Sequence, residues 1–229
     1  MSPPAVSTRG LGRRFGRCWA LAHVDLEVAA GDLVLLAGAN GSGKTTLLRL
    51  IAGLLRPSAG SLRVFGLDPV AEPLAVRRRL SVVGHQPFLY GELSARETLA
   101  LWNRLLERPW PAATIPELLE AVGLEDAASR EVRTFSAGMR KRLSLARVRL
   151  ERPRLLLLDE PFAALDQDGQ DLVDRWISEF RDDGGAVVMA SHDLSRASGH
   201  GARAVLLRSG QAVWTGAARD LGERLRMPN

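Results

Sequence analysis

The residue pattern with the clearest chemistry is a glycine-rich stretch that ends in a lysine and a threonine. It reads Gly38-Ala39-Asn40-Gly41-Ser42-Gly43-Lys44-Thr45 and is followed by Thr46. Glycines let backbone N–H groups converge on phosphate oxygens, a lysine ammonium reaches the terminal phosphates of a nucleotide, and a threonine hydroxyl is a ligand for Mg²⁺. The alternative, an ordinary glycine-rich turn, needs neither Lys44 nor Thr45. The stretch therefore predicts a loop that binds ATP and Mg²⁺.

Lys44 also stands out because the chain otherwise uses arginine. Lysine occurs only at positions 44 and 141, although the chain has 31 lysine and arginine residues. A compact ammonium on a flexible stem suits a phosphate site that a planar guanidinium would fill poorly. This placement favours a specific role for Lys44.

A second candidate group is the acidic pair Asp159 and Glu160, which follows the apolar residues 155–158. At the end of a buried strand, Asp159 can hold Mg²⁺ through water, and Glu160 can polarise an attacking water molecule. Acidic pairs are common at strand ends, so this pair alone is a weak signal. After a phosphate-binding loop, it predicts nucleotide hydrolysis.

Two further positions have both an ordinary and a functional interpretation. The segment Ser136-Ala137-Gly138-Met139 begins a predicted helix, and such a start either caps the helix or binds an anion. His192 is either a buried structural histidine or a group that contacts phosphate. The residues alone leave both alternatives open.

Strands and helices must position these groups at one place. Residues 33–37 and 155–158 are apolar runs without alternation, as expected for strands buried on both faces of a largely parallel sheet. Residues 45–55 are expected to form a buried helix that ends before Pro57. The last third predicts a helix over residues 168–181, a strand over 186–190, and a hairpin formed by 203–208 and 211–215.

The middle of the chain is predicted to be helical. Residues 94–97 and 114–117 both read Ser/Thr-x-x-Glu, the pattern of a capping box at the start of a helix. A third helix is expected after Ser136. We therefore expect one cassette, with an ATP-binding α/β core over residues 1–87 and 151–229 and an inserted helical subdomain over residues 88–150.

Composition excludes several classes of function. The net charge is +5, but the basic residues are scattered apart from residues 77–79 and 140–142, so we expect no nucleic-acid face. Cys18 is the only cysteine, so no internal disulfide is expected and a reducing cytosolic location is favoured. Residues 1–5 show no secretory signal, and the apolar stretches are too short to cross a bilayer.

Together these motifs resemble those of the ABC (ATP-binding cassette) ATPases over essentially the whole chain. Residues 38–45 resemble the Walker A motif, residues 155–160 the Walker B motif, and residues 135–139 the ABC signature. Gln86 matches the Q-loop, Asp166 the D-loop, and His192 the switch histidine. Phe15 stands where the family places an aromatic residue that stacks on adenine.

The resemblance implies an α/β P-loop cassette with a mostly parallel core sheet, N-terminal antiparallel strands and the inserted helical subdomain. It also implies that two subunits sandwich two ATP molecules, each site combining one Walker A motif with the partner's signature. Ser136 and the Gly138 backbone would then touch the γ-phosphate bound by the partner. Ala137, Met139 and Asp166 would also belong to the nucleotide-binding residues.

The same resemblance assigns the remaining roles. Glu160 would position water, and His192 would hold the γ-phosphate beside Lys44. Gln86 would sense Mg²⁺, which Thr45 and Asp159 also hold, and would link the subunit to integral membrane permease subunits. The subunit would work as a homodimer at the cytoplasmic face of the cell membrane.

The signature departs from the usual pattern at three positions. Ala137 replaces a glycine, Phe135 a leucine and Met139 a glutamine. Since the phosphate-facing Ser136 and Gly138 remain, hydrolysis is still expected. Phe15 replaces the more usual tyrosine, and stacking needs only the ring.

Residues 82–99 indicate a particular family among the ABC ATPases. This segment contains Gly84-His85-Gln86 and resembles the ATP-binding subunit of the cytochrome c maturation heme exporter (the CcmA family), with Thr98 in place of its usual asparagine. A drug, lipid or polysaccharide exporter is the first alternative. The second is a non-transport ABC ATPase acting on nucleic acid or ribosomes, although such proteins usually carry two fused cassettes.

Overall fold

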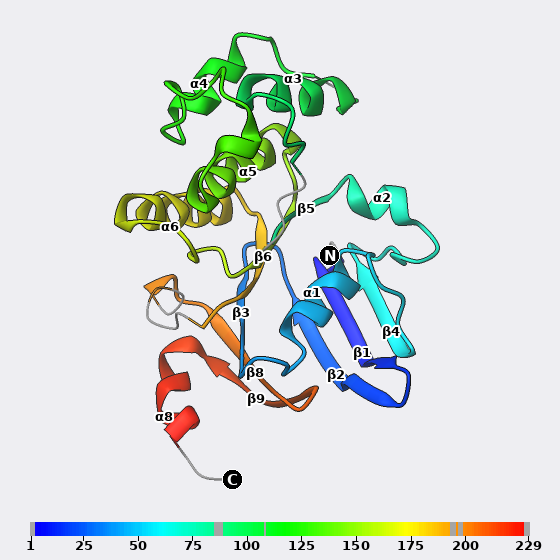
Figure 1. The fold of residues 1–229 in the computed structure, drawn as a ribbon. Coiled ribbons are helices and arrows are strands. Elements are labelled where there is room, and N and C mark those ends of the chain that lie inside the picture. Colours follow the sequence, from blue (N-terminus) through cyan, green and yellow to red (C-terminus); the bar gives the residue numbers. More distant parts are fainter. Residues whose placement is uncertain (1–2, 85–88, 108, 193–195, 197–198, 227–229) are drawn as a thin grey trace.

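Two β-sheets form the centre of the protein in the computed structural model, which describes residues 3–84, 89–107, 109–192, 196 and 199–226 (Figure 1). The smaller sheet is antiparallel, has the order β2-β1-β4, and consists of β1 (Val6–Phe15), β2 (Cys18–Val28) and β4 (Ala59–Val64). The larger sheet consists, in spatial order, of β5 (Leu80–Val83), β6 (Leu155–Asp159), β7 (Ala186–Ala190), β3 (Leu33–Ala37), β8 (Arg203–Arg208) and β9 (Gln211–Ala217). Its strands pair in parallel except for β8 with β9, which form the expected hairpin. The predicted fold class is confirmed.

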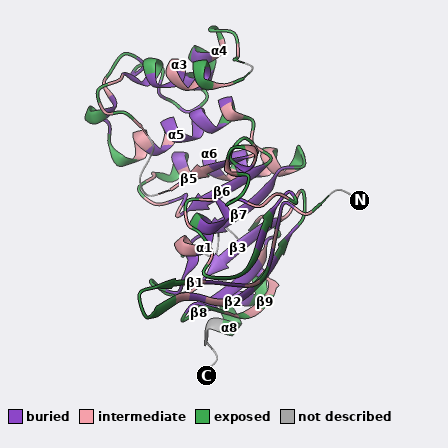
Figure 2. Ribbon diagram, turned by 90° about the vertical axis from the view of Figure 1, so that its right-hand side faces the viewer, coloured by how far each residue is buried: buried purple, intermediate pink, exposed green. Residues whose placement is uncertain are grey.

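The middle of the larger sheet is buried on both faces. Every residue of β3, β6 and β7 is buried, and Figure 2 shows these strands in purple. Along β3, Leu33 and Leu35 belong to one hydrophobic cluster, and Val34 and Leu36 belong to another. Side chains alternate across a strand, so continuous apolar runs fill the core on both sides of this sheet.

The helices cover both faces of the larger sheet and extend beyond it at one end. They are α1 (Lys44–Ile51), α2 (Pro73–Arg77), α3 (Ala95–Leu105), α4 (Thr114–Glu120), α5 (Ala137–Glu151), α6 (Gln167–Asp182) and α8 (Leu221–Arg226), with 3₁₀ turns η1 (Val132–Thr134) and η2 (Ala218–Asp220). Figure 1 shows α3, α4 and α5 together at the end away from the smaller sheet. In the described part of the chain, no helix is both long enough and apolar enough to cross a membrane.

One of the two predicted capping boxes is present. The Ser94 hydroxyl accepts a hydrogen bond from the Glu97 N–H at 3.2 Å, and the Glu97 carboxylate accepts one from the Ser94 N–H at 2.8 Å. The box predicted at Thr114 is wrong, because α4 begins at Thr114 itself and Ala113 is its N-cap without a side-chain cap bond. The Thr114 N–H already donates to the Pro111 carbonyl, so the turn starts earlier than the pattern indicated.

The predicted end of the first helix is also wrong. Helix α1 ends at Ile51, and Gly53 follows with a φ of 67°. The N–H groups of Leu54 and Leu55 then donate to the Arg49 carbonyl, as in glycine-terminated helices. Gly53 therefore ends this helix before Pro57 is reached.

Candidate active site

The carboxyl ends of three neighbouring parallel strands meet at one edge of the larger sheet. Gly38 directly follows β3, Glu160 directly follows β6, and His192 lies two residues after β7. Since β6, β7 and β3 are adjacent in the sheet, these positions lie close together. Ligands of open α/β sheets bind at this edge.

The glycine-rich loop requires glycine where it packs against the strands. Gly38 has a φ of 141°, and a Cβ there would lie 2.2 Å from the Leu207 carbonyl oxygen. Gly43 has a φ of 110°, and a Cβ there would lie 2.7 Å from the Ala20 carbonyl oxygen. Helix α1 starts directly after Gly43, and the first N–H groups of a helix have no partner within it. The loop thus presents donors and the positive end of a helix to an anion.

Two polar groups of the loop are available to phosphate oxygens. Lys44 is 8% exposed, and its ammonium donates to the carbonyl oxygens of Gly38 at 2.8 Å and Ala39 at 3.0 Å. The buried Ser42 hydroxyl has no hydrogen-bond partner among the described residues. A buried cation on neutral partners and an unpaired hydroxyl fit a site for a polyphosphate.

The candidate magnesium ligands lie in contact. The Thr45 hydroxyl donates to a carboxylate oxygen of Asp159 at 2.9 Å. Hydroxyl and carboxylate oxygens are ligands that Mg²⁺ takes together with phosphate oxygens and water, so this donor set fits the ion. Gln86, the third predicted ligand, lies outside the described residues.

Glu160 and His192 form the candidate hydrolytic pair. Nδ1 of His192 lies 2.8 Å from Oε2 of Glu160, and the His192 backbone N–H donates to the same oxygen at 3.3 Å. The Glu160 side chain is 15% exposed, whereas the His192 side chain is 78% exposed. The alternative of a buried structural histidine is therefore excluded.

The phosphate loop and the acidic pair share one pocket of about 200 Å³. Its lining residues are Ala20, Asn40, Gly41, Gly43, Lys44, Thr45, Thr46, Asp159 and Glu160.

Phe15 lies outside this lining, at the end of β1, where it pairs with Cys18. Phe15 is 47% exposed, and the Arg13 guanidinium carbon lies 4.6 Å from the centroid of its ring. The exposed ring can still offer a face for stacking.

The signature residues lie in a different pocket of about 490 Å³. Ser136 is the N-cap of α5, and its hydroxyl accepts a hydrogen bond from the Met139 N–H at 3.1 Å. Ser136, Gly138 and Met139 line this second pocket, while Ala137 is exposed beside them. Within one chain the structure does not bring these residues to Lys44.

Asp166 lines the signature pocket as well. It is the N-cap of α6, and its carboxylate accepts hydrogen bonds from the Gly169 N–H at 2.9 Å and from Arg142 at 2.6 Å. The Gly169 N–H first, and the Arg142 side chain second, hold the pKa of Asp166 below its usual range. Asp166 therefore stays ionised at the edge of the signature pocket.

Lys141 makes a contact at this site that the sequence pattern did not predict. Its ammonium donates to the main-chain carbonyl of Glu160 at 2.6 Å. The one feature of the sequence that could have indicated a role for Lys141 is that it is the only lysine besides Lys44. The contact itself depends on how α5 packs against the end of β6, which no local pattern shows.

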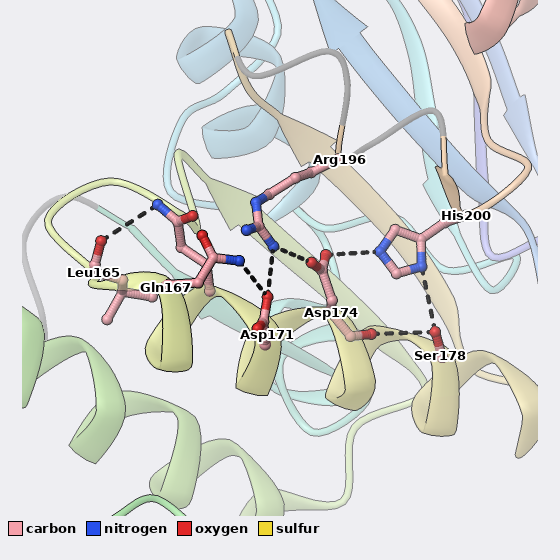
Figure 3. Close-up of polar contacts among 8 residues, drawn as sticks. Leu165, Gln167, Asp171, Asp174, Ser178, Arg196 and His200 are labelled. Atoms are coloured by element: carbon pink, nitrogen blue, oxygen red, sulfur yellow. Dashed lines mark hydrogen bonds and ion pairs between the residues drawn. The ribbon is translucent and has the colours of Figure 1, made fainter.

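A polar network on α6 was also missed, and Figure 3 shows it. Asp171 accepts a hydrogen bond from Arg196 at 3.1 Å, and Asp174 forms an ion pair with the same guanidinium. On its other oxygen, Asp174 lies 2.9 Å from Nε2 of His200, whose Nδ1 lies 3.3 Å from the Ser178 hydroxyl. This network attaches two residues that follow β7 to the helix that begins after Asp166.

Fold and site together define the class of the protein. A mostly parallel sheet carries a phosphate loop, an acidic pair and a histidine at one edge, and the start of α5 in the helical insertion lines a second pocket. The sequence profile described as "ABC transporter" matches residues 21–163, and the chain belongs to this family of ATPases.

Individual relatives agree with this assignment. The chain is 35% identical over 223 residues to the daunorubicin/doxorubicin resistance ATP-binding protein DrrA of Streptomyces peucetius, covering 96% of this chain and 68% of that protein. It is 33% identical over 210 residues to the ABC transporter ATP-binding protein NatA of Bacillus subtilis (strain 168), covering 90% and 85%. A dimeric post-hydrolysis structure of the ATP-binding cassette MJ0796 bound to ADP and Pi is similar with a TM-score of 0.84 and 25% identity, covering 93% and 99%. The predicted ABC ATPase is confirmed.

Proposed function

We propose that this subunit binds MgATP between two copies of itself, hydrolyses it, and drives an exporter through integral membrane subunits at the cytoplasmic face of the cell membrane. One observation supports the hydrolytic part most strongly. The groups needed for phosphate binding, metal binding and water activation converge at one sheet edge, namely Lys44, Thr45, Asp159, Glu160 and His192.

Each group has a defined task in this proposal. Lys44 and the loop N–H groups bind the β- and γ-phosphates, and Thr45 and Asp159 hold Mg²⁺. The metal supplies neutralisation of phosphate charge when bound. Glu160 accepts a hydrogen bond from a water molecule and aligns it with the γ-phosphorus, where a new P–O bond forms as the bond to the β-phosphate oxygen breaks. His192 holds the Glu160 carboxylate in place.

The signature pocket explains why two copies are proposed. Ser136 and the start of α5 offer a serine hydroxyl and helix N–H groups, yet they lie apart from the phosphate loop of their own chain. A second copy, facing the first, would bring its signature to the open side of the ATP. The dimeric relative bound to ADP and Pi supports this arrangement.

Phosphate release by the purified subunit with MgATP tests the hydrolytic proposal. Lys44→Ala removes the ammonium that binds the phosphates, so turnover is expected to fall by about 10²-fold or more, and chelation of Mg²⁺ is expected to stop it. Arg49→Ala is the matched control, since Arg49 is an exposed cation on the same helix. Equal turnover in Lys44→Ala and the wild type would refute the proposal.

A groove of about 700 Å³ is the proposed docking site for the membrane subunit. It runs between α2 with β5 on one side and α3 with α5 on the other. Leu74 and Leu105, which are 69% and 67% exposed, lie on it. Four arginines and two glutamates line the groove, so it favours a partner segment with apolar and acidic side chains.

Co-purification with the membrane subunits tests this docking site. Leu105→Glu places a carboxylate in the apolar and basic groove and is expected to weaken co-purification while the isolated subunit still hydrolyses ATP. Val213→Glu is the control, because Val213 is 49% exposed on β9, away from the groove. Loss of the partner with Val213→Glu alone would place the docking site elsewhere.

The exported compound has two candidates that rest on different observations. Residues 82–99 resemble the heme exporter subunit of cytochrome c maturation, which supports heme. The likeness to DrrA, named for daunorubicin and doxorubicin resistance, supports a planar drug. Inverted vesicles that contain the subunit and its co-purified membrane partners separate the two, through ATP-dependent uptake of heme or of daunorubicin.

A further inference from the structure

Lys141 is a buried cation that nucleotide binding does not explain. It lies in the second turn of α5, its exposure is 9%, and its ammonium donates to the Glu160 main-chain carbonyl at 2.6 Å. Burial lowers the pKa of Lys141, while the carboxylates of Asp159 and Glu160 act in the opposite direction. A buried ammonium is costly unless its partners are well placed, so this position calls for a specific function.

The first turns of α5 contact the segment between the catalytic glutamate and α6 at three points. Lys141 holds Glu160, and Arg142 holds Asp166 at 2.6 Å. Between them, Gly138 packs so closely that a Cβ there would lie 2.8 Å from the Ala164 carbonyl oxygen. The signature helix therefore contacts the segment 160–166 at its two ends and near its middle.

The backbone of segment 160–166 contains unfavourable dihedral angles that the surrounding contacts must stabilise. Glu160 has a φ of 51° and Ala164 a φ of 65°, both in the left-handed region that residues other than glycine rarely adopt. The Glu160 N–H donates to the Ala190 carbonyl at 2.8 Å, so Lys141 and Ala190 hold the two sides of this residue. A shift of α5 would act directly on the Glu160 main chain.

We propose that Lys141 is a positioning residue. It couples the position of the signature helix α5 to the position of Glu160 in the same chain. The inference rests on the proposed tasks of Glu160 and Ser136. When the partner's ATP binds at the start of α5, Lys141 sets the Glu160 carboxylate against the water in this chain's own site. Occupation of one site thereby controls hydrolysis at the other.

A double-mutant cycle on turnover tests this inference. Lys141→Met keeps the apolar stem and removes the donor, and it is expected to lower kcat about tenfold with unchanged equilibrium affinity for ATP, since a small misplacement of the group that aligns water is costly. In the Glu160→Gln background, which keeps the main-chain carbonyl, the same substitution is expected to have no further effect on residual single-turnover hydrolysis. Such non-additivity identifies groups that act as one unit.

Two further single variants serve as controls for the double-mutant cycle. Arg149→Met is the control, because Arg149 is a cation of α5 that pairs with Glu179 away from Glu160, and its turnover is expected to stay at the wild-type level. Lys141→Arg retains a donor and is expected to restore most of the turnover. If Lys141→Met does not fold, Lys141→Leu, which also lacks a donor, takes its place.

Three outcomes would overturn the inference. They are an equal fold-loss from Lys141→Met in both backgrounds, a loss of ATP affinity in place of kcat, and a folded Lys141→Arg protein as slow as Lys141→Met. A Glu160→Gln protein that turns over like the wild type would instead refute the proposed function of Glu160.

Discussion

Glu160 is held on three sides by groups from distant parts of the chain. Its N–H contacts the Ala190 carbonyl, its own carbonyl contacts Lys141, and its carboxylate contacts His192. A positive φ at a non-glycine residue costs about 1–3 kcal/mol and persists only where surrounding contacts fix it. The contacts around Glu160 therefore fix both its backbone conformation and the direction of its carboxylate.

Glu160→Gln tests the task of this carboxylate. The amide retains the size of the side chain but has no negative charge and cannot take a proton from water, so kcat is expected to fall by about 10²- to 10⁴-fold with little change in ATP affinity. Phosphate release and equilibrium binding of a fluorescent ATP analogue measure the two quantities. Glu179→Gln, on the exposed side of α6, is the control and should match the wild type in both.

Ser136→Arg tests the separation of the two pockets. A bulky cation at the signature is expected to block hydrolysis, because it obstructs the approach of the partner's nucleotide, while the monomer still binds ATP through Lys44. Binding and phosphate release are measured on the same preparation. Loss of ATP binding by the monomer would show that the signature has been assigned wrongly.

Among the secondary-structure elements, the N-termini of three helices supply many of the candidate site residues. Helix α1 begins in the phosphate loop, α5 begins at Ser136, and α6 begins at Asp166. Each start leaves backbone N–H groups for an anion or a capping side chain. The strands then determine which of these starts share a pocket.

The capping box of α3 gives a pH-dependent prediction. The Ser94 N–H, followed by the Ser94 hydroxyl, lowers the pKa of Glu97 below its ordinary value of 4.5. A depressed carboxyl pKa contributes stability above the ordinary value, and this contribution is lost as pH falls through the lowered pKa. Glu97→Gln is therefore expected to be less stable than the wild type near neutral pH, and the difference should disappear in acid.

Denaturant unfolding at neutral and acid pH measures this difference. Glu125→Gln, an exposed carboxyl at the same end of the molecule, is the control. A difference between Glu97→Gln and the wild type that stays constant down to strongly acid pH would contradict the assignment to the capping box.

Local patterns predicted most elements because each depends on neighbouring residues. The strands around Leu35 and Leu157 follow from continuous apolar runs, and the α5 start follows from Ser136. Where a prediction was wrong, another local feature acted first: Gly53 ended α1, and an earlier turn began α4 before Thr114 could cap it.

At the scale of the whole molecule, the contacts that the sequence did not predict join distant segments. Lys141 meets Glu160 because α5 packs against the end of β6, and Arg196 meets Asp174 because the chain returns to α6 after β7. Such contacts depend on tertiary packing, which no spacing of residues in the sequence encodes. The predicted site residues that follow β3, β6 and β7 could be placed because parallel strands bring their ends together.

The described part of the molecule presents two separate pockets on different parts of its surface. The phosphate loop with Glu160 lines one pocket, and Ser136 with Asp166 lines the other. Two copies related by a two-fold axis would complete both sites at once, since a symmetric interface joins each half to the other half of the partner. We therefore expect ATP to make this subunit a dimer.

The direct test of this dimerisation is the molar mass of the Glu160→Gln protein in solution, measured by light scattering with and without MgATP. The protein is expected to be a monomer without nucleotide and a dimer at saturating MgATP, because slow hydrolysis preserves the ATP-bound state. Adding Ser136→Arg to the same chain is expected to restore the monomer. A Glu160→Gln protein that binds ATP yet stays monomeric at saturating MgATP would contradict dimerisation driven by ATP.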